Sequence, residues 1–175
     1  RVLEDIQPYV SRGGIKLEHG LKKFNLSLSK KIAVDIGAST GGFTDCLLQH
    51  GIEKVFAVDV GYGQLDWKLQ SDSKVVSLDR KNARELKSSD INELVDLVVI
   101  DVSFISLKII IPSVINVLKP VGDLIALVKP QFEVGKEKVE NKGIIKDPNK
   151  HLGVLIELNS FMKKQGWPIT NIVPS

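Results

Sequence analysis

The chain has 175 residues, of which 43% are hydrophobic and 26% charged, and it carries a net charge of +3 at pH 7. This mixture is typical of a globular domain with a buried core, and it excludes a disordered or fibrous chain. The apolar runs are far shorter than the ~18 residues that cross a bilayer, so we expect no membrane partner. The single cysteine, Cys46, excludes an internal disulfide, as is usual in the reducing cytoplasm.

Positive charge is concentrated at the N-terminal end of the chain. Residues 1–31 contain seven lysines and arginines against three acidic residues, a net charge of +4, which leaves −1 for the rest. A basic segment beside a nearly neutral domain suits contact with a polyanion, although a lysine-rich solvated surface would look the same. We therefore expect a basic N-terminal segment or linker over residues 1–30, which carries Lys16, and a domain over residues 31–175. Because the first residue is Arg1 and not methionine, we also expect the chain to be part of a longer protein.

Short apolar runs alternate along the chain with segments of helical periodicity. The apolar runs predict strands over residues 31–36, 55–60, 74–78, 95–101, 124–128 and 169–173. Helices are predicted between them, over residues 41–50, 64–70, part of 83–94, part of 107–118 and 148–165. The apolar face of the last helix is predicted to contain Leu152, Leu155, Ile156, Phe161 and Met162. Alternating strands and helices predict an α/β fold, a doubly wound and mostly parallel sheet with helices on both faces.

A glycine-rich segment follows the first predicted strand and opens the first predicted helix. Glycines in such a place permit a tight turn and let a ligand approach the backbone closely. The segment contains the candidate cofactor-binding residues Asp35, Gly37, Ala38, Ser39, Gly41, Gly42 and Phe43. Asp59, at the end of the second strand, could accept hydrogen bonds from both hydroxyls of a ribose. Asp79, at the end of the third strand, could reach an adenine amino group or cap the segment that follows.

Two classes of cofactor bind to loops of this kind. A dinucleotide requires the pattern G-x-G-x-x-G, whose middle glycine lets the pyrophosphate contact the backbone, and Ser39 occupies that middle position here. S-adenosylmethionine carries a sulfonium cation and no phosphate, so acidic residues at strand ends would attract it and would repel a pyrophosphate. Four such residues are present, namely Asp35, Asp59, Asp79 and Asp101. The loop favours S-adenosylmethionine, with NAD and a purely structural glycine turn as alternatives.

Three charged residues lie where reaction chemistry is expected. Asp101 ends the fourth predicted strand and Lys129 ends the fifth apolar run. Because neighbouring parallel strands end at the same edge of a sheet, both side chains should face one crevice. Lys16, in the basic N-terminal segment, could fold over the same edge. A lysine there could take a proton from a hydroxyl or stabilise a developing alkoxide. The alternative is an ion pair that only closes the sheet edge.

Five segments, in order along the chain, resemble the hemolysin A (TlyA) type ribosomal RNA methyltransferases, whose catalytic domain is FtsJ-like. They are SRGGIKL at residues 11–17, DIGASTGGFT at 35–44, VDVGYGQL at 58–65, DVSFIS at 101–106 and LVKPQFEVGK at 127–136. The resemblance implies that residues 31–175 form a Rossmann-like class I methyltransferase fold that binds S-adenosylmethionine. It implies transfer of the methyl group to a ribose 2′-hydroxyl of ribosomal RNA, with ribosomal RNA or ribosomal subunits as partners, a cytoplasmic location and no metal.

FtsJ-like members of the family use a Lys-Asp-Lys-Glu tetrad, and Lys16, Asp101 and Lys129 match its first three positions. The fourth is expected on a strand beyond Ser175, since Glu157 lies in the middle of a predicted helix. The family also carries a small RNA-binding domain upstream. The resemblance therefore implies a catalytic domain truncated at its C-terminus and separated from that upstream domain, whose activity at this length is in question.

Three other functions stay open. The family's hemolysin name suggests a membrane-active protein, which the lack of a long apolar segment argues against. A small-molecule methyltransferase of the same fold would have a closed substrate pocket in place of an open basic edge at residues 1–31. An RNA-binding module with an inactive site would not bind the methyl donor.

Overall fold

The computed structural model describes residues 7–134, 145 and 147–175. In these residues five strands form one sheet in the order β3-β2-β1-β4-β5, and every neighbouring pair is parallel. The strands are β1 (Ile32–Ile36), β2 (Lys54–Val58), β3 (Val75–Leu78), β4 (Val95–Ile100) and β5 (Leu118–Ala126). The strand order runs outward from β1 to β3 and then returns to the other side of β1 with β4. The predicted α/β fold with a doubly wound parallel sheet is confirmed.

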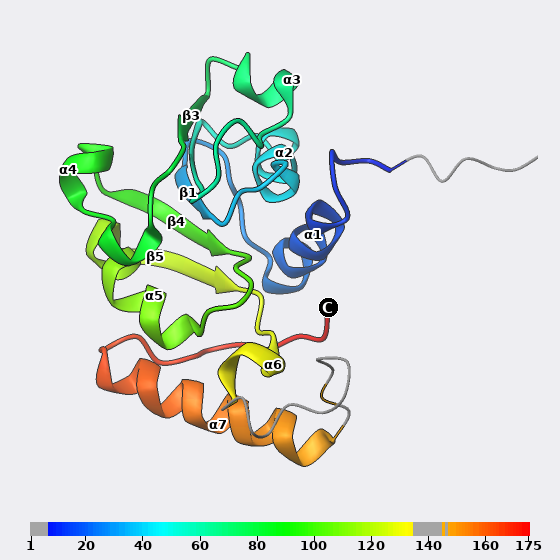
Figure 1. Cartoon of the computed structure of the whole chain (residues 1–175), viewed down its shortest axis with the longest axis vertical. Coiled ribbons are helices and arrows are strands. Elements are labelled where there is room, and N and C mark those ends of the chain that lie inside the picture. The colour runs from blue at the N-terminus through cyan, green and yellow to red at the C-terminus, as the bar shows by residue number, and fades with distance from the viewer. Residues whose placement is uncertain (1–6, 135–144, 146) are drawn as a thin grey trace, which may run out of the picture.

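Helices lie on both faces of this sheet (Figure 1). They are α1 (Gly13–Phe24), α2 (Gly42–Gln49), α3 (Trp67–Gln70), α4 (Ser88–Ile91), α5 (Leu107–Val114), α6 (Pro130–Glu133) and α7 (Pro148–Lys164), with short 3-10 helices η1 (Ala83–Glu85) and η2 (Ile115–Val117). The predicted helical stretch over residues 83–94 is thus two single turns, and the one over residues 107–118 is α5 followed by η2.

The core of the described residues has two large hydrophobic layers, one on each face of the sheet, and a smaller cluster of Ala38, Ala57, Leu65 and Leu69. Side chains along a strand alternate between its faces. In β4, Leu97 and Val99 pack with α1 and α2, whereas Val98 and Ile100 pack on the opposite side with α5 and α7. All four side chains are fully buried. We call these the α1–α2 layer and the α5–α7 layer. A strand covered on both faces reads as a continuous apolar run, which explains why the sequence predicts it well.

Helix α1 was not predicted from the sequence. Leu17 and Leu21, one turn apart on this helix, are buried in the α1–α2 layer. Lys22 and Lys23 in its last turn are exposed, where their charges complement the negative end of the helix. The described part of the basic segment therefore packs onto the domain and presents its lysines to solvent.

Helix α7 occupies the predicted segment and buries part of the predicted face, since Met162 is buried and Phe161 packs against the core. Val154, Leu158 and Met162, spaced four residues apart, pack in the α5–α7 layer. Leu152 and Ile156, which were predicted for the buried face, are 57% and 60% exposed. That part of the prediction is wrong, because the helix contains more apolar residues than one face holds and only packing selects among them.

The predicted strand over residues 169–173 is also wrong. These residues run back along α7 (Figure 1), and Ile169 packs half-buried against the α5–α7 layer. A strand requires hydrogen bonds to a neighbouring strand, and within the described residues this segment pairs with none. Of the long loop predicted over residues 130–146, the first four residues form α6, and residues 135–144 and 146 lie outside the described residues.

Candidate functional site

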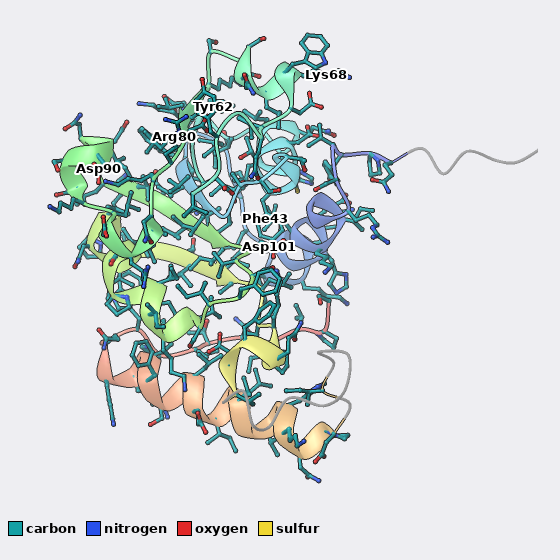
Figure 2. The ribbon with its side chains drawn as sticks, viewed as in Figure 1. Phe43, Tyr62, Lys68, Arg80, Asp90 and Asp101 are labelled. Carbon is teal, nitrogen blue, oxygen red and sulfur yellow. The ribbon has the colours of Figure 1, made fainter. Side chains whose placement is uncertain are left out.

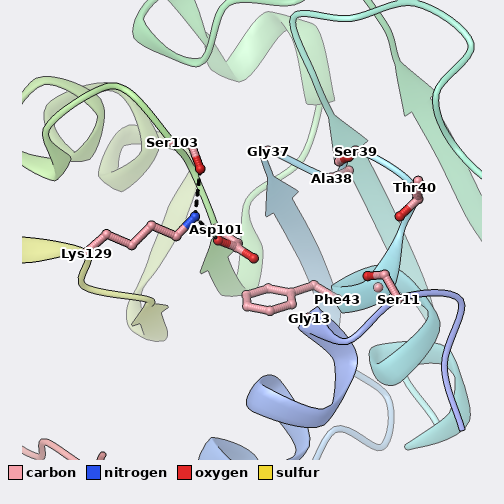
Figure 3. Close-up of a pocket in the computed structure, with 11 residues that line it drawn as sticks. Ser11, Gly13, Gly37, Ala38, Ser39, Thr40, Phe43, Asp101, Ser103 and Lys129 are labelled. Atoms are coloured by element: carbon pink, nitrogen blue, oxygen red, sulfur yellow. Dashed lines mark hydrogen bonds and ion pairs between the residues drawn. The ribbon is translucent and has the colours of Figure 1, made fainter. Parts of the chain in front are cut away.

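A cavity of about 290 Å³ opens at the carboxyl ends of β1 and β4, where the strand order reverses (Figure 3). Sheets of this kind bind ligands at such a point because the loops of the two strands diverge there. The cavity is lined by Ser11, Gly13, Gly37, Ala38, Ser39, Thr40, Gly42, Phe43, Asp101, Ser103 and Lys129. Most of the predicted site residues are among them. The predicted residues outside this lining are Lys16, Asp35, Gly41, Asp59 and Asp79.

The glycine loop, residues 37–42, runs directly against the end of β4. Gly37 has a φ of +81°, and a Cβ added there would lie 2.6 Å from the carbonyl oxygen of Asp101. A larger residue would therefore force the loop away from β4 and would also strain the backbone. Gly41, with a φ of +98°, is the N-cap of α2 and stands outside the lining. Its positive φ turns the chain from the loop into the helix.

Asp59 and Asp79 brace loops beside the cavity. The Asp59 carboxylate accepts the backbone N–H of Ser39 at 2.8 Å and that of Gly61 at 2.7 Å. Ser39 has a φ of 50°, an uncommon conformation for a residue other than glycine, and the hydrogen bond to Asp59 helps to hold it. Asp79 accepts the N–H of Gly63 at 2.9 Å, and this bond together with a neighbouring serine hydroxyl lowers the pKa of Asp79. Both aspartates therefore shape the loops that a cofactor would contact.

Asp35 lies beneath the glycine loop, fully buried in the core. The Thr44 hydroxyl donates to Asp35 Oδ2 at 2.7 Å, whereas Oδ1 has no hydrogen-bond partner among the described residues. Burial disfavours the charged carboxylate and raises the pKa of Asp35 to about 7, although the hydrogen bonds from Thr44 act in the opposite direction. Asp35 joins the end of β1 to α2 under the loop.

Asp101 and Lys129 meet across the ends of β4 and β5. Lys129 Nζ lies 2.6 Å from Asp101 Oδ1 and donates to the hydroxyl of Ser103 at 2.9 Å (Figure 3). The lysine and aspartate side chains are 22% and 25% exposed, so water screens their attraction less than that of a surface pair. The structure thus brings these two predicted residues together in the cavity wall, with the lysine amine held at a defined place.

Helix α1 reaches the cavity with its N-terminal end. A Cβ added at Gly13 would lie 3.5 Å from the ring of Phe43 and 3.6 Å from Asp101 Oδ2, and Figure 2 shows Phe43 and Asp101 beside each other. Lys16 lies one turn further along α1, and its side chain is exposed. The structure therefore places the helix at the site, but it does not bring Lys16 into the cavity lining.

Two residues beside the ion pair were not predicted as site residues. Ser103 lines the cavity and binds Lys129. Phe104 has a φ of 64°, costly for an aromatic residue, and its side chain is 92% exposed. Its ring centroid lies 5.1 Å from that of Phe132 in α6. Both residues belong to the DVSFIS segment at residues 101–106, on which the resemblance partly rests. The sequence therefore pointed to the segment but not to the contacts of these two residues.

The requirements of a metal site and of a membrane-spanning helix can be compared with the described part of the chain. Residues 7–134, 145 and 147–175 hold no group of three or more His, Cys, Asp or Glu side chains that could bind a metal ion. In the same ranges, every helix is too short or too polar to cross a bilayer.

The strand order, the glycine loop after β1 and the acidic and lysine side chains after β4 and β5 define an α/β domain with a cavity at the switch point, where such domains bind their ligands. The sequence matches the FtsJ-like methyltransferase family over residues 9–175, and the chain belongs to that family. The predicted resemblance and the methyltransferase fold are thereby confirmed.

Three relatives give the extent of the similarity. A Bacillus subtilis (strain 168) protein, provisionally named rRNA methyltransferase YqxC, is 51% identical over 160 residues, which are 91% of this chain and 57% of the relative. The 16S/23S rRNA (cytidine-2′-O)-methyltransferase TlyA of Mycobacterium tuberculosis is 43% identical over 166 residues, which are 95% of this chain and 62% of the relative. A solved structure from Streptococcus thermophilus, provisionally named a hemolysin, is 47% identical with a TM-score of 0.89 and covers 93% of this chain and 59% of that one. The chain thus spans between 57% and 62% of the length of these relatives.

Proposed function

We propose that this chain is the catalytic domain of an S-adenosylmethionine-dependent methyltransferase that modifies a ribose 2′-hydroxyl of ribosomal RNA. The observation that carries the proposal is the Asp101–Lys129 ion pair, which faces the glycine loop across one cavity (Figure 3). A relative named as an rRNA (cytidine-2′-O)-methyltransferase, 43% identical to this chain, supports ribosomal RNA as the substrate. This substrate implies a cytoplasmic location.

S-adenosylmethionine fits the residues of this cavity. The backbone of the glycine loop forms one wall, and Phe43 adds an apolar surface beside it. Among the lining residues Lys129 is the one cation, and Asp101 already neutralises it, so the cavity offers little to a pyrophosphate. In this proposal Asp59 and Asp79 shape the loops that contact the cofactor. Asp35 supports the glycine loop from beneath through its bond to Thr44.

The catalytic step follows from the position of Lys129. Bound S-adenosylmethionine supplies an electrophilic methyl group. The ribose hydroxyl loses its proton as its oxygen bonds to the methyl carbon and the carbon–sulfur bond of the donor breaks, which leaves a neutral thioether. Lys129 Nζ accepts that proton if it enters the step as a neutral amine, or stabilises the developing alkoxide if it stays an ammonium. Asp101 and Ser103 hold Nζ in place for this task. Holding the hydroxyl and the methyl donor in one cavity lowers the barrier further by orientation.

Helix α1 connects the cavity to the basic surface. Its N-terminal end lines the cavity, and its last turn carries the exposed Lys22 and Lys23. RNA lying along this helix would extend from the basic segment of residues 1–30 to the methyltransferase domain of residues 31–175. In this proposal Lys16 completes the site from α1, with its side chain turning toward Asp101 once RNA is bound.

Incubation of the full-length protein with ribosomal subunits and methyl-labelled S-adenosylmethionine tests the proposal. We expect label in ribosomal RNA at one or a few nucleotides whose 3′ phosphodiester bonds resist alkaline cleavage, because a 2′-O-methyl group removes the attacking hydroxyl. Label in small molecules alone, or no label, would contradict the proposal. Dye release from liposomes tests the hemolysin alternative, and we expect none.

A further inference from the structure

The loop after β4 and helix α6 after β5 are joined at a second point, away from the ion pair. The carboxylate of Glu133, the last residue of α6, accepts a hydrogen bond from the Ser106 hydroxyl at 2.6 Å and from the backbone N–H of Leu107 at 2.8 Å. Ser106 is the N-cap of α5, and Leu107 is its first residue. The negative charge of Glu133 therefore lies at the positive end of α5, where it is stabilised.

Together with the ion pair, these contacts close a ring of chain on one side of the cavity. One side of the ring is the chain from Asp101 to Ser106, and the other is the chain from Lys129 to Glu133. The Lys129–Asp101 ion pair joins the two sides at one end, and the hydrogen bond from Ser106 to Glu133 joins them at the other. Each side is only a few residues long, so a shift at the Glu133 end moves the Lys129 end.

Both sides of this ring depend on the contacts that close it. Helix α6 has four residues and is too short to be stable by itself. The opposite side contains Phe104, whose φ of 64° persists only where the surroundings fix the backbone. The rings of Phe104 and Phe132 contact each other in the middle, 5.1 Å between centroids.

We propose that Glu133 is a positioning residue for methyl transfer, which holds Lys129 and the loop of residues 101–106 in their mutual arrangement. The inference rests on the proposed function, because it takes Lys129 as the group that acts on the substrate hydroxyl. Without Glu133, α6 and the N-terminus of α5 separate, and Lys129 Nζ is no longer held at the substrate oxygen. A displacement of about 1 Å at a reacting group costs about 10²-fold in rate.

Three substitutions distinguish the effect of the two hydrogen bonds of Glu133 from the effect of its negative charge. Glu133→Gln keeps the length, and its amide can accept from Leu107 N–H and donate to the Ser106 hydroxyl oxygen. Glu133→Asp keeps the charge but is one methylene too short to reach both groups. Glu133→Ala removes both bonds. In the full-length protein we expect kcat for ribosomal RNA methylation to fall about 10²-fold for Ala and Asp and to stay near wild type for Gln. KM for S-adenosylmethionine should change little in all three.

A matched control and a second readout complete the experiment. The Glu157 carboxylate contacts Lys108 of the same helix α5 at 2.9 Å, but from α7 and outside the ring, so Glu157→Ala should leave kcat unchanged. The rate of hydrogen exchange at the Leu107 amide reports its hydrogen bond to Glu133 and requires no methylation activity. It should become faster in Glu133→Ala and Glu133→Asp and stay unchanged in Glu133→Gln.

Two results would overturn the inference. One is a wild-type kcat in Glu133→Ala with unchanged exchange of the Leu107 amide. The other is a loss in Glu133→Gln as large as that in Glu133→Ala, which would assign the effect to charge. If Glu133→Ala does not fold, the comparison of Asp with Gln decides by the same criterion. A wild-type protein that leaves ribosomal RNA unmethylated contradicts the proposed function instead. Hydrogen exchange of the Leu107 amide then still tests whether Glu133 holds the start of α5.

Discussion

Lys129 Nζ and Asp101 Oδ1 lie 2.6 Å apart because their residues follow two adjacent parallel strands. A second ion pair joins the same two strands near their amino ends, where Lys119 Nζ lies 2.7 Å from Asp96 Oδ1. The two pairs have the same residue types and similar geometry, but only the first lines a cavity. If the proposed function holds, the first pair acts on the substrate and the second only joins the strands.

Lys129→Ala is expected to reduce methylation of ribosomal RNA by the full-length protein about 10²–10⁴-fold, the usual effect of losing a general base. Binding of S-adenosylmethionine should change little, because the glycine loop forms the other wall of the cavity. Lys129→Arg should not restore activity if Lys129 accepts the proton, since arginine does not release a proton at working pH, whereas partial rescue would assign Lys129 the stabilisation of the alkoxide. Initial rates and calorimetry check the two effects. Lys119→Ala is the matched control and should methylate normally; equal rates for the two alanine variants would refute the assignment.

Asp59→Ala is expected to weaken binding of S-adenosylmethionine about 10- to 100-fold, which corresponds to roughly 1.5–3 kcal/mol for a hydrogen bond to a charged group. The reason is that Asp59 holds the N–H groups of Ser39 and Gly61, so the loop loses its shape without it. Calorimetry with S-adenosylmethionine and with NAD measures the change. Asp72→Ala serves as the control, because the Asp72 carboxylate accepts a local hydrogen bond from the backbone N–H of Lys74 in the chain between α3 and β3. An unchanged affinity in Asp59→Ala, or a preference of the wild type for NAD, would count against the cofactor site.

The free energy of unfolding is expected to be larger at pH 5 than at pH 8 on account of Asp35. Burial raises the folded-state pKa of Asp35 from 3.8 to about 7, so between these values the folded protein binds more protons than the unfolded chain. Stability therefore falls as the pH rises from about 4 to about 7 and stays lower above that range, by on the order of 4 kcal/mol for this group. Urea unfolding of the wild type and of Asp35→Asn at both pH values measures the effect. The Asn variant keeps an acceptor for Thr44 and should lose most of this pH dependence; an equal pH dependence in both proteins would show that Asp35 does not cause it.

Charge reversal of Arg12, Lys22 and Lys23 is expected to weaken binding of ribosomal RNA by the full-length protein. All three side chains are exposed at the two ends of α1. The slope of log affinity against log salt should become shallower by roughly 0.7–0.9 for each phosphate that the protein no longer neutralises. Filter binding over a range of salt concentrations measures the slope. The exposed Lys163 and Lys164 at the end of α7 give a control reversal, and an equal loss of affinity in both variants would mean that net charge alone governs binding.

The sequence predicts those parts of the fold and site that local pattern determines. The apolar runs that become β1 and β4 are buried on both faces, so their residues carry the strand signal without ambiguity. Parallel pairing then places the residues that follow adjacent strands at one edge, which is why the meeting of Asp101 with Lys129 could be expected from their positions alone.

Other features depend on contacts between distant segments and could not be predicted. Helix α1 begins with two glycines and is rich in lysine, so its amphipathic character becomes visible only once Leu17 and Leu21 have α2 to pack against. The positive φ of Phe104 has no local cause in the sequence. Likewise, the bond from Ser106 to Glu133 joins loops that are 27 residues apart and exists only when the sheet has formed.

The cavity lies at the carboxyl ends of the strands, between segments that are far apart in the sequence. Its walls come from α1 and Phe43 of the α1–α2 layer and from the chain that follows β4 and β5 on the side of α6. A ligand there contacts the glycine loop, the start of α1 and the chain after β4 and β5 at once, so unfolding of any one of these segments would release it. At a concentration of 100 times its Kd, such a ligand adds about 2.7 kcal/mol to the free energy of unfolding. The temperature of thermal unfolding should therefore rise with the concentration of the ligand.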